Sequence, residues 1–213
     1  MTTAIAEGAD SVQASLISVA GTPTGEERLR AEFYLLLAHL LAAPVDGSLL
    51  KHLTGLPGDD SILGMALSEL AEAARNTNLA AIEEEFNNLF IGIGGGELIS
   101  YGSHYICGFL HDKPLADLRN DLSRLGISRI NDTPEPEDHV AALCEVMAGL
   151  IVGNFGFLSP LDEQREFFST HVGSWMPRFF VDLENADNAN FYRQVGKLGR
   201  VFIEIEVEAF TLT

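Results

Sequence analysis

The helical spacing of the apolar side chains constrains this chain more than any other feature. After Gly25 these side chains recur every three or four residues, at Leu29, Phe33, Leu36, Leu37 and Leu40. This spacing gathers them on one face of an α-helix, and Pro44 ends the pattern. Similar patterns follow along most of the chain. The sequence therefore predicts an all-α fold, a single-domain helical bundle.

Two more helices are expected soon after Pro44. Asp46 can cap a short helix that runs through Leu53. Either Asp59 or Asp60 can cap the next helix, whose apolar stripe consists of Ile62, Leu63, Leu67, Leu70 and Ala74. A further helix is expected at residues 78–90, with the acidic residues 83–85 mainly off its apolar face.

The second half of the chain shows clear helix boundaries. Pro114 begins a helix with a leucine stripe, and Gly126 occupies the position of the glycine just beyond a helix C-terminus. Pro136 is suited to the first turn of the next helix, whose inward residues are Val140, Leu143, Met147 and Leu150. Aromatic-rich helices are expected at 161–172 and 175–184.

The last segment fits two patterns. Phe191, Val195, Leu198 and Phe202 have helical spacing, whereas residues 203–208 alternate like an exposed strand. A strand needs a partner, and no other segment alternates or carries a hairpin signal. We therefore favour helix.

The domain organisation follows from these patterns. Residues 1–24 show little periodicity and end in Gly-Thr-Pro-Thr, which predicts a flexible or loosely docked arm. Residues 25–213 then form one domain, since 213 residues with 46% hydrophobic content suffice for one substantial core.

The charge balance limits the partners. The chain has 13 basic and 31 acidic residues, a net charge of -18. This charge repels nucleic acid and anionic lipid and favours a cationic partner, although many acidic proteins have none. No Lys or Arg precedes Arg28, so the apolar residues 16–20 lack the positive flank of a secretory signal. We expect a cytoplasmic protein without membrane insertion.

The cysteines do not indicate a disulfide or a zinc site. Cys107 and Cys144 lie far apart in the sequence, and neither belongs to a CxxC or Cys/His cluster. Both are expected to be buried thiols.

The glycine run at residues 92–96 invites comparison with a phosphate-binding loop. It follows a helix instead of a strand, and it lacks the Gly-Lys-Ser/Thr ending. A flexible connection explains it better. Leu89 and Phe90 would then lie beside the rim of a groove that opens for an extended ligand.

Residues 101–105, Tyr-Gly-Ser-His-Tyr, are a candidate binding segment. On a helix, Tyr101 and Tyr105 would share a face and line an apolar groove with their hydroxyls in water. Ser103 beside His104 does not predict a hydrolase, because no nucleophile elbow surrounds the serine. No catalytic residues are expected.

Residues 135–139, Glu-Pro-Glu-Asp-His, allow three explanations. Acidic residues in a first turn complement the helix dipole. Glu135 and His139 have metal-ligand spacing, and with His104 they would make a metal-dependent hydrolase. In the third explanation Asp138 accepts hydrogen bonds from an arginine of a ligand, which His139 orients. A helical interaction module without a peptide groove is a further alternative.

The order of these motifs resembles that of a known family. The order is Phe86-x-x-Leu89-Phe90-x-Gly92, Tyr101-x-Ser103-x-Tyr105, Glu135-Pro-x-Asp138-His139 and Phe168-x-x-His171-x-x-x-Trp175. Over residues 26–213 the chain resembles the TorD/DmsD (NarJ-like) family of redox-enzyme maturation chaperones.

The resemblance implies an all-helical cytoplasmic chaperone that is not an enzyme. Such a protein binds the twin-arginine leader, the body, or both, of a molybdopterin oxidoreductase subunit and assists cofactor insertion and assembly before export. The resemblance implies no metal and no cofactor of its own, apart from the weak guanine-nucleotide binding associated with some members.

The resemblance also implies a peptide-binding surface. Carried over by position, together with the neighbouring His104 and Glu135, it consists of Leu89, Phe90, Tyr101, Ser103, His104, Tyr105, Glu135, Asp138 and His139. Tyr101 and Tyr105 stand where relatives often carry tryptophan, and glycines 94–96 replace a bulkier loop, which points to a client different from those of the relatives. Residues 96–103 and 115–126 resemble members associated with formate dehydrogenases; clients of the DMSO/TMAO reductase type are the alternative.

Overall fold

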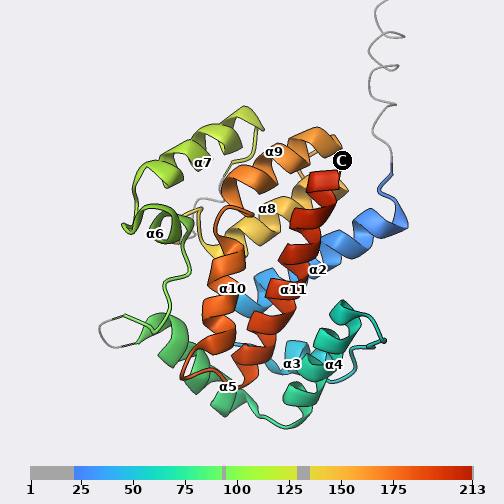
Figure 1. Ribbon diagram of the computed structural model, residues 1–213, viewed down its shortest axis with the longest axis vertical. Helices are drawn as coiled ribbons and strands as arrows, with labels where there is room; N and C mark the ends of the chain where they lie inside the picture. Colours follow the sequence, from blue (N-terminus) through green and yellow to red (C-terminus); the bar gives the residue numbers. More distant parts are fainter. Residues whose placement is uncertain (1–21, 93–94, 129–134, 213) are drawn as a thin grey trace, which may run out of the picture.

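The computed structural model describes residues 22–92, 95–128 and 135–212, and this part of the chain is helical without a strand (Figure 1). The helices are α2 Gly25–Ala42, α3 Gly47–Leu53, α4 Ile62–Arg75, α5 Leu79–Phe86, a π-helix Asn87–Ile91, α6 Gly102–Cys107, α7 Lys113–Arg124, α8 Val140–Val152, α9 Leu161–His171, α10 Met176–Asn185 and α11 Phe191–Leu212. The all-α prediction is confirmed. Residues 1–21 of the predicted arm lie outside the described residues, and Thr24 forms a capping box with Glu27 at the start of α2.

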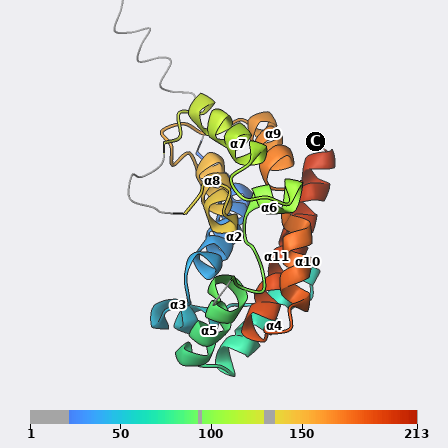
Figure 2. The same cartoon turned by 90° about the vertical axis from the view of Figure 1, so that its left-hand side faces the viewer.

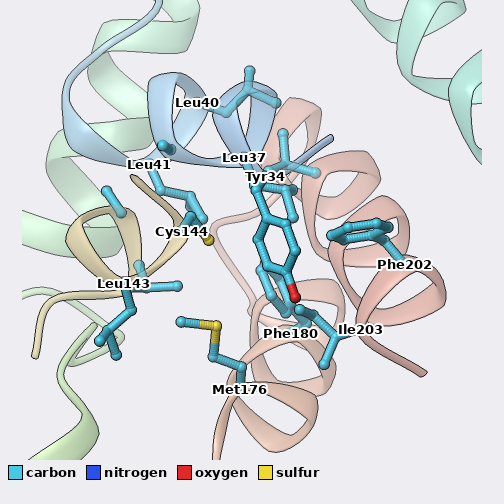
Figure 3. Close-up of a cluster of buried hydrophobic side chains, with 14 of the residues drawn as sticks. Tyr34, Leu37, Leu40, Leu41, Leu143, Cys144, Met176, Phe180, Phe202 and Ile203 are labelled. Atoms are coloured by element: carbon cyan, nitrogen blue, oxygen red, sulfur yellow. The ribbon is translucent and has the colours of Figure 1, made fainter. Parts of the chain in front are cut away.

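The core lies between α2, α8, α10 and α11. The closest helix pairings are α2 with α8 and α10 with α11. Figure 3 shows side chains from α2, α8, α10 and α11 meeting there, among them Leu37, Cys144, Phe180 and Phe202. Helices α7 and α9 lie at one end of the molecule and α3, α4 and α5 at the other (Figures 1 and 2).

Several predicted boundaries are confirmed by the capping contacts. Asp46 caps α3, since its carboxylate accepts a hydrogen bond of 2.8 Å from the amide of Leu49. Gly126 follows α7 with a φ of 68°, a left-handed conformation that glycine adopts without a steric penalty. Residues 203–208 belong to α11, so the helix is confirmed there.

Other boundaries were predicted wrongly. Ser61 caps α4, and Asp59 instead accepts a 2.8 Å hydrogen bond from the amide of Ser61. The helix predicted at 78–90 is α-helical only to Phe86 and continues as a π-helix. Helix α8 begins at Val140 with His139 as its cap, so Pro136 precedes the helix. Proline often occupies the first turn of a helix, but here the imidazole of His139 caps the helix three residues after Pro136.

The two cysteines differ in exposure. Cys144 is buried in α8, as predicted, and burial raises the pKa of its thiol. Cys107 is exposed, so that prediction was wrong. Cys107 is the last residue of the six-residue helix α6, and its neighbour Ile106 is exposed as well.

A buried ionic cluster joins α2 to α11. Glu206 is 2% exposed, and its carboxylate accepts two hydrogen bonds of 2.8 Å from the guanidinium of Arg30. The hydroxyl of Tyr34 donates to the same carboxylate at 3.1 Å. Burial and the charge of Glu206 raise the pKa of Tyr34 well above its ordinary value. The alternation of residues 203–208 wrongly suggests a strand with its acidic side chains in solvent. In the helix Glu206 faces the core, while its apolar neighbours Ile205 and Val207 are exposed.

Removing Glu206 should therefore destabilise the fold strongly. We expect Glu206→Ala to lower the free energy of unfolding by about 3 kcal/mol, because it leaves the guanidinium of Arg30 largely buried without its partner. Glu208→Ala, on the exposed face of the same helix, should cost less than about 0.5 kcal/mol. Urea denaturation followed by circular dichroism measures both, and equal losses would contradict the role of the cluster.

Candidate functional site

The two predicted motifs meet through their backbones. The amide of Gly102 donates to the carbonyl of Asp138 at 2.9 Å, and the amide of Val140 donates to the carbonyl of Ser100 at 2.9 Å. Tyr101 and His139 thereby form an isolated antiparallel bridge. We call this pairing of residues 100–103 with residues 138–140 the junction. It fixes the start of α6 against the start of α8.

Close packing at the first residue of α6 requires glycine. A Cβ on Gly102 would lie 3.0 Å from the indole nitrogen of Trp175. That nitrogen donates a 2.7 Å hydrogen bond to the carbonyl of His171, so the indole has little freedom to move away. Glycine at position 102 therefore meets a packing requirement beside the site.

Asp138 has one carboxylate oxygen engaged and one without a partner. The side chain is 3% exposed, and Oδ2 accepts a hydrogen bond of 2.8 Å from the amide of Ser103. Oδ1 of Asp138 and the hydroxyl of Ser103 are buried and have no hydrogen-bond partner among the described residues. Both residues line a hollow of about 210 Å³, which we call the Asp138 hollow, together with Tyr101, Leu110, His111 and Pro136. A buried carboxylate oxygen of this kind is a strong acceptor for a ligand that brings a donor.

His139 serves as the cap of α8 and is held neutral. Its Nδ1 accepts a hydrogen bond of 3.3 Å from the amide of Ala141, which places the ring proton on Nε2. Burial lowers the pKa of His139, against the opposing effect of the charges on Glu135 and Asp138. The imidazole packs edge-on against the ring of Tyr101, with centroids 5.1 Å apart.

Tyr101 and Tyr105 do not share a face, so that prediction was wrong. Tyr101 precedes α6 in an extended conformation, and its hydroxyl donates to Glu135. Tyr105 donates to Asp182 at 3.0 Å and packs against Trp175. Burial, reinforced by the neighbouring carboxylate, raises the pKa of each tyrosine above its ordinary value.

His104 and Tyr105 line a separate hollow of about 240 Å³. Its other walls come from residues 96–99 and from Arg178 and Asp182 of α10. The guanidinium carbon of Arg178 lies 5.7 Å from the centre of the Tyr105 ring. The predicted site residues therefore do not share one hollow, since Tyr101, Ser103 and Asp138 line the Asp138 hollow whereas His104 and Tyr105 line this second one.

Leu89 is not available as a contact residue in this structure. Its side chain is fully buried, while Phe90 is half-buried and packs on Phe86 and Tyr192. The segment after the glycine run folds back here, since the amide of Leu98 donates to the carbonyl of Leu89 at 2.8 Å. Of this predicted pair, only Phe90 presents any surface. Residues 93–94 of the glycine run lie outside the described residues.

The described residues do not support the metal-dependent hydrolase. No group of three or more His, Cys, Asp or Glu side chains among them is arranged to hold a metal ion. Glu135 and His139 flank Tyr101, whereas His104 packs beside Tyr105 in the other hollow. In the described part of the chain no helix is both long and apolar enough to cross a membrane.

Two features of this region were missed by sequence reasoning. The turn after α6 exposes apolar side chains, and Phe109 is 71% exposed. The lack of helical periodicity in this turn was the sequence feature that could have indicated it. A groove of about 690 Å³ lies between α2, α7 and α8, and Glu135 and His139 are among its lining residues. The groove carries no local sequence signal because it forms only when α2 packs beside α7 and α8, which follow it by about seventy residues or more along the chain.

Comparisons with known proteins agree on one family. The family model described as nitrate reductase delta subunit matches residues 56–181. The chain is 27% identical over 203 residues to "Chaperone protein TorD" of Vibrio atlanticus (strain LGP32), covering 84% of this chain and 93% of the relative. It is 29% identical over 202 residues to the protein of the same name from Aliivibrio fischeri (strain ATCC 700601 / ES114), with the same coverage of 84% and 93%.

A solved structure shares the fold. It is the crystal structure of a putative redox enzyme maturation protein from Archaeoglobus fulgidus, with a TM-score of 0.54 and 20% identity. The similarity covers 82% of this chain and 93% of that chain. The all-helical arrangement is therefore one that a known structure also adopts.

The depressed pKa of His139 predicts a specific pH dependence of stability. Between the pKa of the folded state and the unfolded value of 6.5, the unfolded chain binds more protons at this residue. Neutral His139 therefore makes its full contribution to the free energy of unfolding above the pKa that it has in the unfolded chain. This contribution is lost as the pH falls toward the pKa that it has in the folded protein. His139→Asn keeps a capping oxygen and removes the titration.

Denaturation curves of both proteins between about pH 7.5 and 5.5 test this expectation. The stability of the wild type should fall relative to that of His139→Asn as the solution is acidified. Parallel pH profiles for the two proteins would contradict it.

Proposed function

Because the chain belongs to the nitrate reductase delta subunit family, we propose that it is a cytoplasmic chaperone for the maturation of a molybdopterin oxidoreductase. The family match covers more than half of the chain and confirms the resemblance to the TorD/DmsD family. The chain is not an enzyme, since its relatives are named as chaperones. Its partner in this proposal is the catalytic subunit of a redox enzyme, of the formate dehydrogenase or the DMSO/TMAO reductase type.

In this proposal the chaperone binds the twin-arginine leader, the body of the subunit, or both. It thereby holds the subunit for cofactor insertion and assembly before export. We propose no cofactor of the chaperone itself, and the guanine-nucleotide binding implied by the resemblance stays a prediction.

The observation that supports leader binding best is Oδ1 of Asp138, which is buried and has no hydrogen-bond partner within residues 22–92, 95–128 and 135–212. A guanidinium group entering the Asp138 hollow would donate to Oδ1 and balance the buried negative charge. Ser103 offers a hydroxyl at the same place. The hollow has an apolar wall in Leu110, which suits the methylene part of an arginine side chain.

The electrostatics of the surroundings favour a cation. Glu135 is exposed beside Tyr101, and the whole chain carries a net charge of -18. His139 is kept neutral by burial, so its imidazole does not repel an approaching guanidinium. Binding should weaken with salt without being abolished, because apolar contacts are not screened.

Calorimetric titration with synthetic twin-arginine leaders of molybdopterin oxidoreductases tests the proposal. The folded protein should bind the leader, and a leader with both arginines replaced by glutamine should bind at least about ten-fold more weakly. Failure to bind any twin-arginine leader or any oxidoreductase subunit would overturn the proposal.

Asp138→Asn tests the arginine acceptor without breaking the junction. Asparagine retains an oxygen for the amide of Ser103 but lacks the negative charge, so affinity for the leader should fall about ten-fold, or roughly 1.4 kcal/mol. Asp60→Asn, which removes the same charge from an exposed loop, is the matched control. The melting temperature should change little in both variants. Unchanged affinity in folded Asp138→Asn would exclude Asp138 as the acceptor.

A further inference from the structure

The segment that joins α6 to α7 gathers exposed apolar side chains (Figure 1). We call residues 108–112 the α6–α7 turn. Phe109 and Leu110 of this turn are exposed, as is Ile106 at the end of α6. Phe109 is the one exposed phenylalanine in the described part of the chain. Large apolar side chains that gather at one place on a surface generally mark a site of contact.

Two residues in a left-handed conformation bound the turn. Gly108 ends α6 with a φ of 83°, and a Cβ there would meet no atom within 4 Å. His111 has a φ of 60° and is the only residue other than glycine with a positive φ among the described residues. A side chain makes this conformation unfavourable, so a change of backbone conformation at His111 relieves strain. Gly108 and His111 therefore have the properties of hinges.

Few contacts hold the turn in place. All hydrogen bonds of residues 108–112 with the described residues join partners within four positions of each other in the sequence. The amide of Gly108 donates to the carbonyl of His104 at 2.8 Å. The carbonyl of Phe109 accepts a long contact of 3.6 Å from the thiol of Cys107. The turn can therefore move without breaking a hydrogen bond to a distant part of the described chain.

The turn forms one wall of the Asp138 hollow. Leu110 and His111 line the hollow together with Ser103 and Asp138. Oδ1 of Asp138 and the hydroxyl of Ser103, both buried, have no hydrogen-bond partner among the described residues. Phe109 directly precedes the two wall residues of the turn, yet it lies in solvent and lines no part of the hollow. A change of direction at the hinges would bring its ring to the mouth of the hollow.

An aromatic ring over the hollow suits the ligand of the proposed function. The face of a phenyl ring attracts a guanidinium group. The chain makes this contact elsewhere, since the guanidinium carbon of Arg30 lies 5.2 Å from the centre of the Phe210 ring and that of Arg178 lies 5.7 Å from the centre of the Tyr105 ring. A ring that covers the hollow also excludes water, which strengthens the attraction between a guanidinium and a carboxylate.

We propose that the α6–α7 turn is a lid over the Asp138 hollow. When an arginine of the client's leader enters the hollow, the turn pivots at Gly108 and His111, and the ring of Phe109 covers the guanidinium. The exposed position of Phe109 is then the open form of the lid. The inference rests on the proposed function and adds to its site a residue that sequence reasoning missed.

A second copy of the chain is a poorer partner for Phe109. Two chains that each carry a net charge of -18 repel one another. The turn and the end of α6 offer three large apolar side chains, Ile106, Phe109 and Leu110, which is less than a stable dimer interface needs.

Removal of the ring tests the lid. Phe109→Ala should keep the melting temperature of the wild type, because the side chain is exposed. Its affinity for the intact leader should fall about five-fold, the size of one contact between a cation and a ring. Its affinity for the leader with both arginines replaced by glutamine should stay within about two-fold of that of the wild type, since no cation is left to cover.

Ile62→Ala is the matched control for this variant. It removes an exposed apolar side chain at the start of α4 and should bind both leaders like the wild type.

Closure of the lid can be followed by fluorescence. The chain has one tryptophan, Trp175, and it is buried, so acrylamide should quench mainly the new indole of Phe109→Trp. Saturation with the intact leader should lower the quenching constant of this variant at least about two-fold, because the covered ring is shielded from water. Ile62→Trp should be quenched equally with and without the leader.

The possible outcomes separate this inference from the proposed function. If the wild type binds no leader, both fail. If the wild type binds but Phe109→Ala binds equally tightly, or if the indole of Phe109→Trp stays equally accessible in the complex, the lid is overturned while the proposed function stands. A wild type that sediments as a dimer beside a monomeric Phe109→Ala would assign the ring to a second copy and would also overturn the lid. Weakened binding by Phe109→Ala together with a protected indole supports it.

Discussion

The functional region depends on the junction between residues 100–103 and residues 138–140. Two backbone hydrogen bonds of 2.9 Å and the bond from the Ser103 amide to Asp138 hold segments that are more than thirty residues apart. Without them, the short helix α6 would be positioned only by side-chain contacts, such as those of Gly102 and Tyr105 with Trp175. The junction also sets the first turn of α8, because His139 both pairs with Tyr101 and caps that helix.

The distribution of charge explains how an acidic protein builds a cohesive bundle and still presents a negative surface. Several of its few cations form ion pairs between helices, and these pairs tie α11 to its neighbours. Arg30 binds Glu206, Lys197 binds Glu69 of α4, and Arg200 binds Glu184 of α10. Acidic residues outnumber basic residues 31 to 13 in the chain, so the surface as a whole attracts positive charge.

The sequence predicts the helices well and the site only in part. Periodicity is a local property, so the stripe from Leu29 to Leu40 and the cap at Asp46 could be recognised directly. The alternation of residues 203–208 could not show that Glu206 is buried, because its partner Arg30 lies near the other end of the chain. Leu89 was placed on a surface by resemblance, yet the segment after the glycine run folds over it. The groove between α2, α7 and α8 arises from tertiary packing, which no local pattern encodes.

Asp138 links ligand binding to the fold. One of its oxygens accepts from the amide of Ser103, and the other is buried and has no hydrogen-bond partner in the part of the chain that the structure describes, which is unfavourable for a carboxylate. A guanidinium at this position would remove that cost only in the folded state, because the carboxylate of the unfolded chain is already hydrated. A ligand that binds there consequently stabilises the protein. The junction is therefore where occupancy of the site and the stability of α6 and α8 would be coupled.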